Sequence, residues 1–248
     1  GTVADVVPLQ DENRIITYHG LKVMNYKPRL SIQVLKNLKK VETITSRTLA
    51  FQFGPLINAA GRLKDADMAV RFLLSNDRQE AEKMAQILDA TNTERREKES
   101  QMIQTALKLA DEQKNSPALI LVSPEFHEGV NGIVATRLVD SFYKPVLILT
   151  ENEGKIKGSG RSIPELNLKD VLSDCSDLLE RFGGHAAAAG CSLMPENLEA
   201  FHDRFIKLCN DRLPKLLVPK LHLDGSLDYS ELTEHFIEQL NRLQPFGE

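Results

Sequence analysis

Residues 80–110 combine apolar helical periodicity at both ends with a purely polar middle. Apolar positions recur at helical spacing from Ala81 to Leu88 and again from Met102 to Ala110. Between them, residues 92–101 (NTERREKESQ) present no apolar face. A helix of this length spans roughly 45–50 Å at ~1.5 Å per residue, and a polar middle is typical of a connection between two folded bodies. The pattern predicts such a connecting helix, with a plain surface helix that carries a charged patch as the alternative.

The composition excludes several classes of protein. With 248 residues and 42% hydrophobic residues, the chain can bury a core and is not intrinsically disordered. No apolar run approaches the ~18 residues of a membrane span. The three cysteines form no C-x-x-C pair, so neither a disulfide framework nor a cysteine-rich zinc site is expected, and a reducing cytoplasm is the expected location. The net charge of −4 means that any nucleic-acid binding must come from a local basic groove.

Residues 116–213 have the pattern of an α/β module. Strand, helix, strand pair, helix, strand and helix follow in that order, which predicts a mixed sheet covered by helices. Gly183-Gly184 is expected to end the second helix as a C-terminal cap. The expected strands are 118–122, 145–150, 155–162 and 187–194, and the expected helices are 129–142, 168–182 and 196–212.

The flanking regions resemble parts of other domains. Residues 1–55 read as the tail of an α/β domain with helices at 13–25 and 31–38, Gly54-Pro55 is a break, and a short helix covers 65–75. After Pro214, a strand and turn at 221–225 and a helix at 231–243 read as the start of a further domain. The chain begins without Met or a signal-peptide pattern, so we interpret it as an internal fragment of a longer protein. The expected divisions are 1–76, 77–115, 116–214 and 215–248.

Two glycine-rich stretches of the α/β module carry more polar side chains than packing needs. Ser159 and Arg161 lie on a glycine-flanked strand, and His185 follows Gly183-Gly184 and precedes a run of alanines that leaves room above the sheet. Arginine can bind a phosphate through two parallel N–H groups, and serine adds a hydrogen bond. We therefore predict that Ser159, Arg161 and His185 converge on one solvent-reachable phosphate pocket. A helix stop explains Gly183-Gly184 in part, but it explains neither His185 nor the alanines.

Two further stretches have alternatives that the sequence leaves open. His127 and Gly129 lie between a strand and a helix, where free backbone N–H groups, helped by Gly132, can receive an anion; a histidine that caps the loop is the alternative. Asn58 and Arg62 belong to the segment INAAGR, whose small residues permit close approach of the backbone to a ligand. A tight helix–helix contact with a solvated arginine explains that segment equally well.

Asp5 follows an apolar run and precedes Pro8, so we expect it at the end of a strand. A carboxylate there can ligate a hard divalent cation, whereas its position alone favours a cap of a helix or turn. One carboxylate is not a metal site, and the sequence has no matching His/Asp cluster elsewhere.

The motifs together resemble the DHH phosphoesterase superfamily. The segment GGHAAAAG is similar to the GGH-x-x-A-A-G signature of the domain associated with DHH-family enzymes. The whole series resembles, in the same order, the RecJ-type single-strand-specific 5′→3′ DNA exonucleases. That series is GTVADVVPL, INAAGRL, HEGVNGIVATRL, SGRSI, LLERFGGHAAAAG and LQPFGE. The resemblance implies the end of a DHH catalytic domain, a connecting helix, a DHH-associated domain and the start of an OB-type domain.

The resemblance also implies a mechanism. Two Mn²⁺ or Mg²⁺ ions, held by Asp and His side chains, activate water for attack on a phosphodiester. Asp5 matches the Asp of the GT-x-AD motif and becomes a catalytic metal ligand by this resemblance. The other ligands, including the Asp-His-His triplet, would lie upstream of Gly1. The resemblance therefore implies that this chain is inactive alone.

The implied substrate is single-stranded DNA, held by phosphate contacts that carry no sequence preference. The resemblance further implies a role in DNA repair and recombination, with a single-strand-binding protein and a helicase as partners and no membrane. The residues implied to hold the 5′ end or backbone of the DNA, or to line or border its groove, are Asn58, Arg62, His127, Gly129, Ser159, Arg161, Gly183, Gly184 and His185.

Two other functions compete with this interpretation. One is a DHH-family phosphoesterase that acts on oligoribonucleotides or small nucleotides. The segment LQPFGE is evidence against this alternative. The other is a non-catalytic nucleic-acid-binding module like the related appended domain of alanyl-tRNA synthetases. Asp5 and the INAAGR segment are evidence against this alternative.

Overall fold

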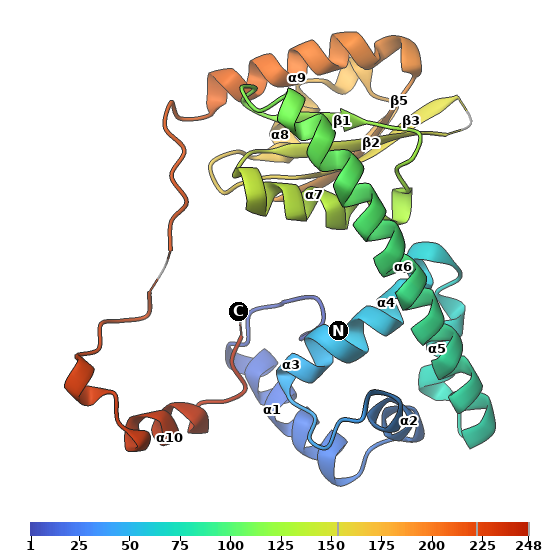
Figure 1. The fold of residues 1–248 in the computed structure, drawn as a ribbon, viewed down its shortest axis with the longest axis vertical. Helices are drawn as coiled ribbons and strands as arrows, with labels where there is room; N and C mark the ends of the chain where they lie inside the picture. Colours follow the sequence, from blue (N-terminus) through green and yellow to red (C-terminus); the bar gives the residue numbers. More distant parts are fainter. Residues whose placement is uncertain (153, 222, 248) are drawn as a thin grey trace. The chain divides into compact units, whose positions relative to one another are not determined.

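The computed structural model of the protein describes residues 1–152, 154–221 and 223–247 (Figure 1). The chain divides into two compact units. The first comprises residues 1–95 and 221–248, and the second comprises residues 96–220. Each unit buries a hydrophobic core of its own. The four-part division predicted from the sequence stays a prediction.

The described residues of the first unit form helices and turns, without a strand. Its core gathers large side chains such as Leu35, Phe53, Phe72 and Leu88, all of which are fully buried. The predicted helices at 13–25, 31–38 and 65–75 are confirmed. The helices that lie wholly in this unit are α1 (Asp11–Tyr26), α2 (Leu30–Lys39), α3 (Ser46–Thr48), α4 (Gly54–Leu63), α5 (Asp67–Leu74) and α10 (Glu234–Arg242), with a π-helical turn at Leu49–Phe53.

The predicted break at Gly54-Pro55 is wrong, because helix α4 begins there. Proline is tolerated in the first turn of a helix, where its missing N–H has no intrahelical partner to lose. Gly54 has a separate role: a Cβ atom at this position would lie 2.9 Å from both the Cβ of Ala4 and the carbonyl oxygen of Leu49. The glycine therefore lets the N-terminal segment approach the start of α4.

The predicted connecting helix is confirmed as one continuous element, α6 (Arg78–Glu112). It runs from the first unit into the second, and the boundary between the units falls after Arg95. Its polar middle differs from the expectation in one respect, since Asn92 and Arg95 are buried. The Nε of Arg95 donates a hydrogen bond to Oδ1 of Asn92 at 3.2 Å, which gives this buried guanidinium a local partner.

The second unit contains the predicted mixed sheet, with the strand order β1-β2-β3-β5-β4. Strands β1 and β2 are parallel and are joined through helix α7, and the other neighbours are antiparallel. Helix α7 covers one face of the sheet, and α8 and α9 lie on the other (Figure 1). The elements are β1 (Leu119–Val122), α7 (Glu128–Phe142), β2 (Val146–Asn152), β3 (Lys155–Arg161), α8 (Leu168–Ser173), β4 (Arg181–Gly184), β5 (Ala188–Leu193) and α9 (Leu198–Arg212).

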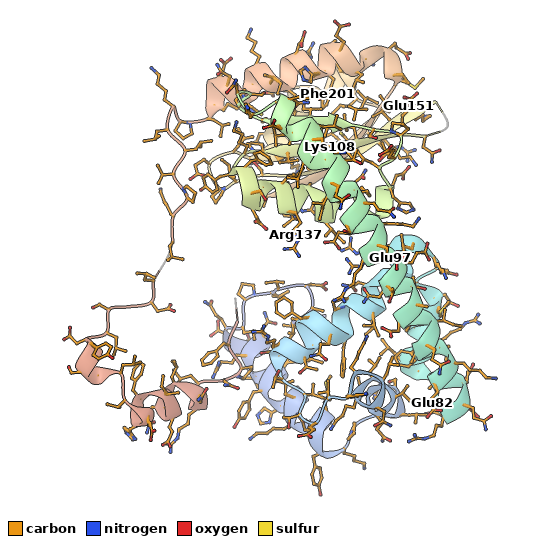
Figure 2. All side chains as sticks on the ribbon, in the orientation of Figure 1. Glu82, Glu97, Lys108, Arg137, Glu151 and Phe201 are labelled. Atoms are coloured by element: carbon orange, nitrogen blue, oxygen red, sulfur yellow. The ribbon has the colours of Figure 1, made fainter. Side chains whose placement is uncertain are left out.

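Both faces of this sheet carry apolar side chains. Phe201 and Phe205 of α9 are fully buried in the core between the sheet and α8 and α9, and Phe201 is labelled in Figure 2. On the opposite face, α7 buries Val134 and Leu138. Arg137 lies on the outer side of α7, away from the sheet (Figure 2), and pairs with Glu99 at 3.8 Å. A sheet covered by helices on both faces explains why β1 and β2 read as continuous apolar runs.

The predicted helix at 168–182 is wrong beyond its first two turns. Helix α8 ends at Ser173, a 3₁₀ turn follows at Ser176–Leu178, and β4 begins at Arg181. Within this segment, Val171, Leu172 and Cys175 are buried, and Leu178 and Leu179 are partly buried against the same core. The pairing of β4 with β5 overrides the local helical pattern, and Glu180 already donates its backbone N–H to the carbonyl of Ser192 at 2.8 Å.

The end of the chain belongs to the first unit. The predicted helix at 231–243 is confirmed as α10, preceded by a 3₁₀ turn at Tyr229–Glu231. The predicted strand at 221–225 is wrong for its described residues, and His222 lies outside the described residues. Arg14 of α1 donates from Nη1 to the carbonyl of Pro245 at 2.9 Å, which ties the segment after α10 to α1.

Candidate phosphate-binding face

Strand β3 places Ser159 and Arg161 on the sheet face that α7 covers. Ser159 pairs with Ile148 and Arg161 pairs with Val146, and Lys157 on the same face pairs with Thr150. The amide of Asn131, on α7, donates to the hydroxyl of Thr150 at 2.9 Å, which identifies this face as that of α7. The intervening residues Gly158 and Gly160 point to the opposite face, where Cβ atoms would strike leucine side chains.

The β4–β5 hairpin continues the same rows across the sheet. Ser159 lies opposite Gly190, which lies opposite Gly183, so one row consists of a serine and two glycines. In the next row, Arg161 lies opposite Ala188. The backbone N–H of His185 donates to the carbonyl of Ala188 at 2.8 Å, which places His185 opposite this alanine. Residues directly opposite one another share a face.

Ala188 of β5 therefore lies between Arg161 of β3 on one side and His185, which follows β4, on the other. Adjacent strands lie about 4.8 Å apart, so roughly 10 Å separates the backbone of Arg161 from that of His185. Both long side chains can reach a group held above the small side chain of Ala188. Arg161 is half-buried and His185 is exposed, so neither is sealed in the core. The register thus puts Ser159, Arg161 and His185 on one sheet face, and their convergence on one phosphate pocket stays a prediction.

The two glycines before His185 have different roles. Gly184 has φ of +138°, a conformation that only glycine adopts readily. A Cβ atom there would lie 2.4 Å from the carbonyl oxygen of Ala188. Gly183 has open space around its missing side chain. The predicted helix cap at Gly183-Gly184 is therefore wrong, because these residues form an edge strand and enter a hairpin turn.

The guanidinium of Arg161 lies against the start of α7. Its Nη1 donates to the carbonyl of Gly160 at 2.9 Å. A Cβ atom built on Gly132 of α7 would lie 2.9 Å from Nη2 of Arg161. The guanidinium thus occupies the space that a side chain at position 132 would need.

A groove of about 840 Å³ runs along the row of Ser159, Gly190 and Gly183, and its lining includes neither Arg161 nor His185. Two ion pairs border it, Lys157 with Glu128 at 3.2 Å and Lys155 with Glu180 at 2.9 Å. The lysine charges are therefore balanced by carboxylates. Arg181 is exposed on β4 and has no ion-pair partner in the described part of the chain. The residues lining the groove include Glu128, Asn131, Lys157, Ser159, Arg181, Gly183 and Gly190.

His127 caps helix α7. Its Nδ1 accepts a hydrogen bond from the backbone N–H of Gly129 at 3.1 Å, in the geometry of an N-cap. The cap, which the sequence offered as the alternative, is thus present, and the Gly129 amide is engaged by it. With Nδ1 as acceptor, the neutral ring carries its proton on Nε2 and can donate from there.

Asp5 lies in a turn rather than at the end of a strand, so that expectation is wrong. Its backbone N–H donates to the carbonyl of Gly1 at 2.9 Å, and its side chain is exposed. Val6, the next residue, has a left-handed backbone with φ of 55°, which a β-branched residue seldom adopts. Among the described residues, no three His, Cys, Asp or Glu side chains gather as a metal site. The described residues alone therefore do not fit a complete metal centre.

Asn58 and Arg62 lie one helical turn apart on the exposed side of α4. The small residues between them, Ala59 and Ala60, are buried in the core of the first unit. The alanines are therefore packed inside the first unit, and both polar side chains lie at the surface.

The predicted site residues thus divide between the two units. Ser159, Arg161, Gly183 and His185 share one sheet face of the second unit. His127 and Gly129 lie at the start of the helix that covers it, whereas Asp5, Asn58 and Arg62 belong to the first unit. The sequence analysis did not select Lys157, Arg181 or Gly190 as site residues, and it named Gly132 only as an aid to anion binding at the start of the helix. The period-two spacing of Lys157 from Ser159 is a signal that could have found the first of these.

Comparison with known proteins shows what the chain is similar to. Residues 98–211 match the model of the DHHA1 domain. The single-stranded-DNA-specific exonuclease RecJ of Bacillus subtilis is 37% identical over 253 residues, which cover 100% of this chain and 32% of the relative. RecJ of Escherichia coli is 37% identical over 262 residues, which cover 100% of this chain and 45% of the relative. Over its whole length, the chain is thus similar to RecJ proteins, and residues 98–211 form a DHHA1 domain.

The solved structures agree with this assignment. The crystal structure of RecJ from Thermus thermophilus in complex with Mg²⁺ superimposes with a TM-score of 0.89 at 32% identity and covers 99% of this chain and 38% of that one. The complex of the same RecJ with Mn²⁺ gives a TM-score of 0.88 at 33% identity, covering 99% of this chain and 37% of that one. The chain spans less than half the length of these RecJ relatives. Among the described helices, none combines the length and apolar character that crossing a lipid bilayer requires.

Proposed function

We propose that the chain forms the substrate-binding part of a RecJ-type exonuclease that degrades single-stranded DNA from its 5′ end. The curated relatives are named single-stranded-DNA-specific exonucleases, and they match the whole of this chain. The observation that carries the proposal is the register that puts Arg161, Ala188 and His185 in one row and Ser159, Gly190 and Gly183 in the next. In the longer protein, these rows hold the phosphate at the 5′ end.

The chemistry of the face supports this role. Arg161 supplies a permanent positive charge with paired N–H donors, and Ser159 and His185 add hydrogen bonds. The floor between them consists of Gly183, Ala188 and Gly190, which carry no side-chain group that could read a base edge. Binding through phosphate alone is independent of sequence, as the degradation of any DNA strand requires.

We further propose roles for the predicted residues outside these rows. His127 donates from Nε2 to the DNA backbone, and Gly129 allows that backbone to approach the start of α7. Asn58 and Arg62 contact the sugar–phosphate chain from the first unit. In the cell we propose a cytoplasmic enzyme of DNA repair and recombination that works with a single-strand-binding protein and a helicase.

Asp5 is proposed as a single metal ligand of the longer protein. The related RecJ structures are complexes with Mg²⁺ and Mn²⁺, and an exposed carboxylate suits either ion. Because the described residues supply no complete site, the chain alone is expected to leave single-stranded DNA intact in the presence of Mn²⁺. Degradation by the purified chain, abolished by Asp5→Asn, would contradict this expectation.

Binding by the chain itself tests the phosphate face. The dissociation constant for a 5′-phosphorylated single strand is measured at fixed salt by fluorescence anisotropy, since salt alone changes such constants. Arg161→Ala is expected to weaken binding by about 1.5–3 kcal/mol, the loss of a charge-assisted hydrogen bond. Arg137→Ala, on the outer side of α7, is the matched control and is expected to change nothing. An unchanged constant for Arg161→Ala would remove Arg161 from the site.

A further inference from the structure

Gly132 is a glycine inside a helix, where the residue is unfavourable. It lies in the second turn of α7, and helical glycines are weaker helix formers than every residue except proline. Its backbone does not need a glycine, since its φ is helical rather than positive. The reason for a glycine at this position must therefore lie in what its missing side chain makes room for.

That room is occupied by one side chain. A Cβ atom at position 132 would lie 2.9 Å from Nη2 of Arg161, 3.4 Å from Cζ and 3.5 Å from Nη1. All three are atoms of the same guanidinium, so the flat group lies against the helix backbone. From the strand side, Nη1 is held by the carbonyl of Gly160 at 2.9 Å. The guanidinium thus lies between the Gly160 carbonyl of β3 and the backbone of α7.

We propose that Gly132 is a positioning residue for Arg161. Because Gly132 has no side chain, the guanidinium can lie against α7 in the position from which it binds the phosphate. This inference rests on the proposed function, because it assigns a purpose to the position of Arg161. An alanine at position 132 would displace the guanidinium by a few tenths of an ångström. The far end of an arginine can move at little cost to the fold, so the displacement acts on ligand binding and leaves stability intact.

The test separates binding from folding. Four forms of the full chain are compared: wild type, Gly132→Ala, Arg161→Ala and the double variant. Dissociation constants are measured at fixed salt for one oligonucleotide with a 5′-phosphate and with a 5′-hydroxyl, together with the thermal unfolding midpoint. Gly20→Ala is the matched control, because Gly20 is a helical glycine of α1 with nothing within 4 Å of its missing side chain.

We expect Gly132→Ala to weaken binding of the 5′-phosphorylated strand by about tenfold, as one displaced charge-assisted hydrogen bond would. Binding of the 5′-hydroxyl strand and the unfolding midpoint should not fall. In the Arg161→Ala background, Gly132→Ala should add nothing, because the group that it displaces is gone. Gly20→Ala should leave both constants unchanged.

The contrary outcomes distinguish the two proposals. An unchanged constant for Gly132→Ala, or additive losses in the double variant, would overturn the positioning role while the phosphate face stands. An unchanged constant for Arg161→Ala would overturn the phosphate face itself. If Gly132→Ala does not fold, the double variant decides: restored folding supports the contact with Arg161, and continued misfolding overturns it.

Discussion

Replacing Gly184 with alanine is expected to disrupt the hairpin of β4 and β5, whereas the same change at Gly183 is expected to leave it intact. The φ of +138° at Gly184 costs any other residue of order 1–3 kcal/mol. The added Cβ would also lie 2.4 Å from the carbonyl oxygen of Ala188 and 2.5 Å from Cα of Ala189. Both are backbone atoms, which cannot rotate away as a side chain can.

The hairpin must therefore open to accept the alanine. Opening it breaks the backbone hydrogen bond from His185 to Ala188, at about 1 kcal/mol, and separates Gly184 from its partner Ala189. Together with the conformational strain, we expect Gly184→Ala to lower the free energy of unfolding by about 2–4 kcal/mol. Gly183→Ala has nothing within 4 Å of its new methyl group and should stay within about 0.5 kcal/mol of wild type.

Urea denaturation followed by circular dichroism gives the free energies. Amide hydrogen exchange at His185 reports the hairpin directly, since its N–H is protected by the bond to Ala188. Equal stability of the two variants, with His185 protected in both, would refute the reasoning. Gly183→Ala also tests binding, because its methyl group would take up space in the groove that Ser159 lines.

Two further predictions concern buried polar groups. Thr150→Val removes the acceptor of the Asn131 amide, whose Oδ1 has no partner among the described residues, and should cost about 1–3 kcal/mol in urea denaturation. Adding Asn131→Leu should recover most of that loss. An unchanged free energy of unfolding for Thr150→Val would contradict the account. Burial raises the pKa of Cys175 to about 11 and those of Cys191 and Cys209 to about 12, from 9.0. Because the folded state keeps these protons, stability is complete below pH 9 and falls as pH rises above it, by about 1.4 kcal/mol per pH unit for each thiol. Replacing all three cysteines with alanine should flatten this alkaline slope, and an equal slope would contradict the assignment.

Much of the second unit could be predicted because its elements are encoded locally. Apolar runs indicated β1 and β2, and helical periodicity indicated α6 and α9. Strand β4 could not be predicted in this way. Leu178 and Leu179 continue the periodicity of α8, and only pairing with β5 turns the following residues into an edge strand.

The candidate site was predictable in composition and less so in arrangement. The spacing of Ser159 and Arg161 already puts both on one face of a strand. The place of His185 depends on the register of β4, and the role proposed for Gly132 depends on a contact with a residue of another element. The left-handed turn beside Asp5 has no local signal, since Val6 is a poor residue for it.

The phosphate face is tested most directly by amide chemical shifts of the chain during titration with a 5′-phosphorylated single strand. We expect the largest changes at Ser159, Arg161, Gly183, His185 and Gly190, with saturation at one dissociation constant. The same strand with a 5′-hydroxyl should produce much smaller changes at these amides. Changes confined to residues outside β3, β4 and β5, or equal changes with either strand, would contradict a phosphate site on this face.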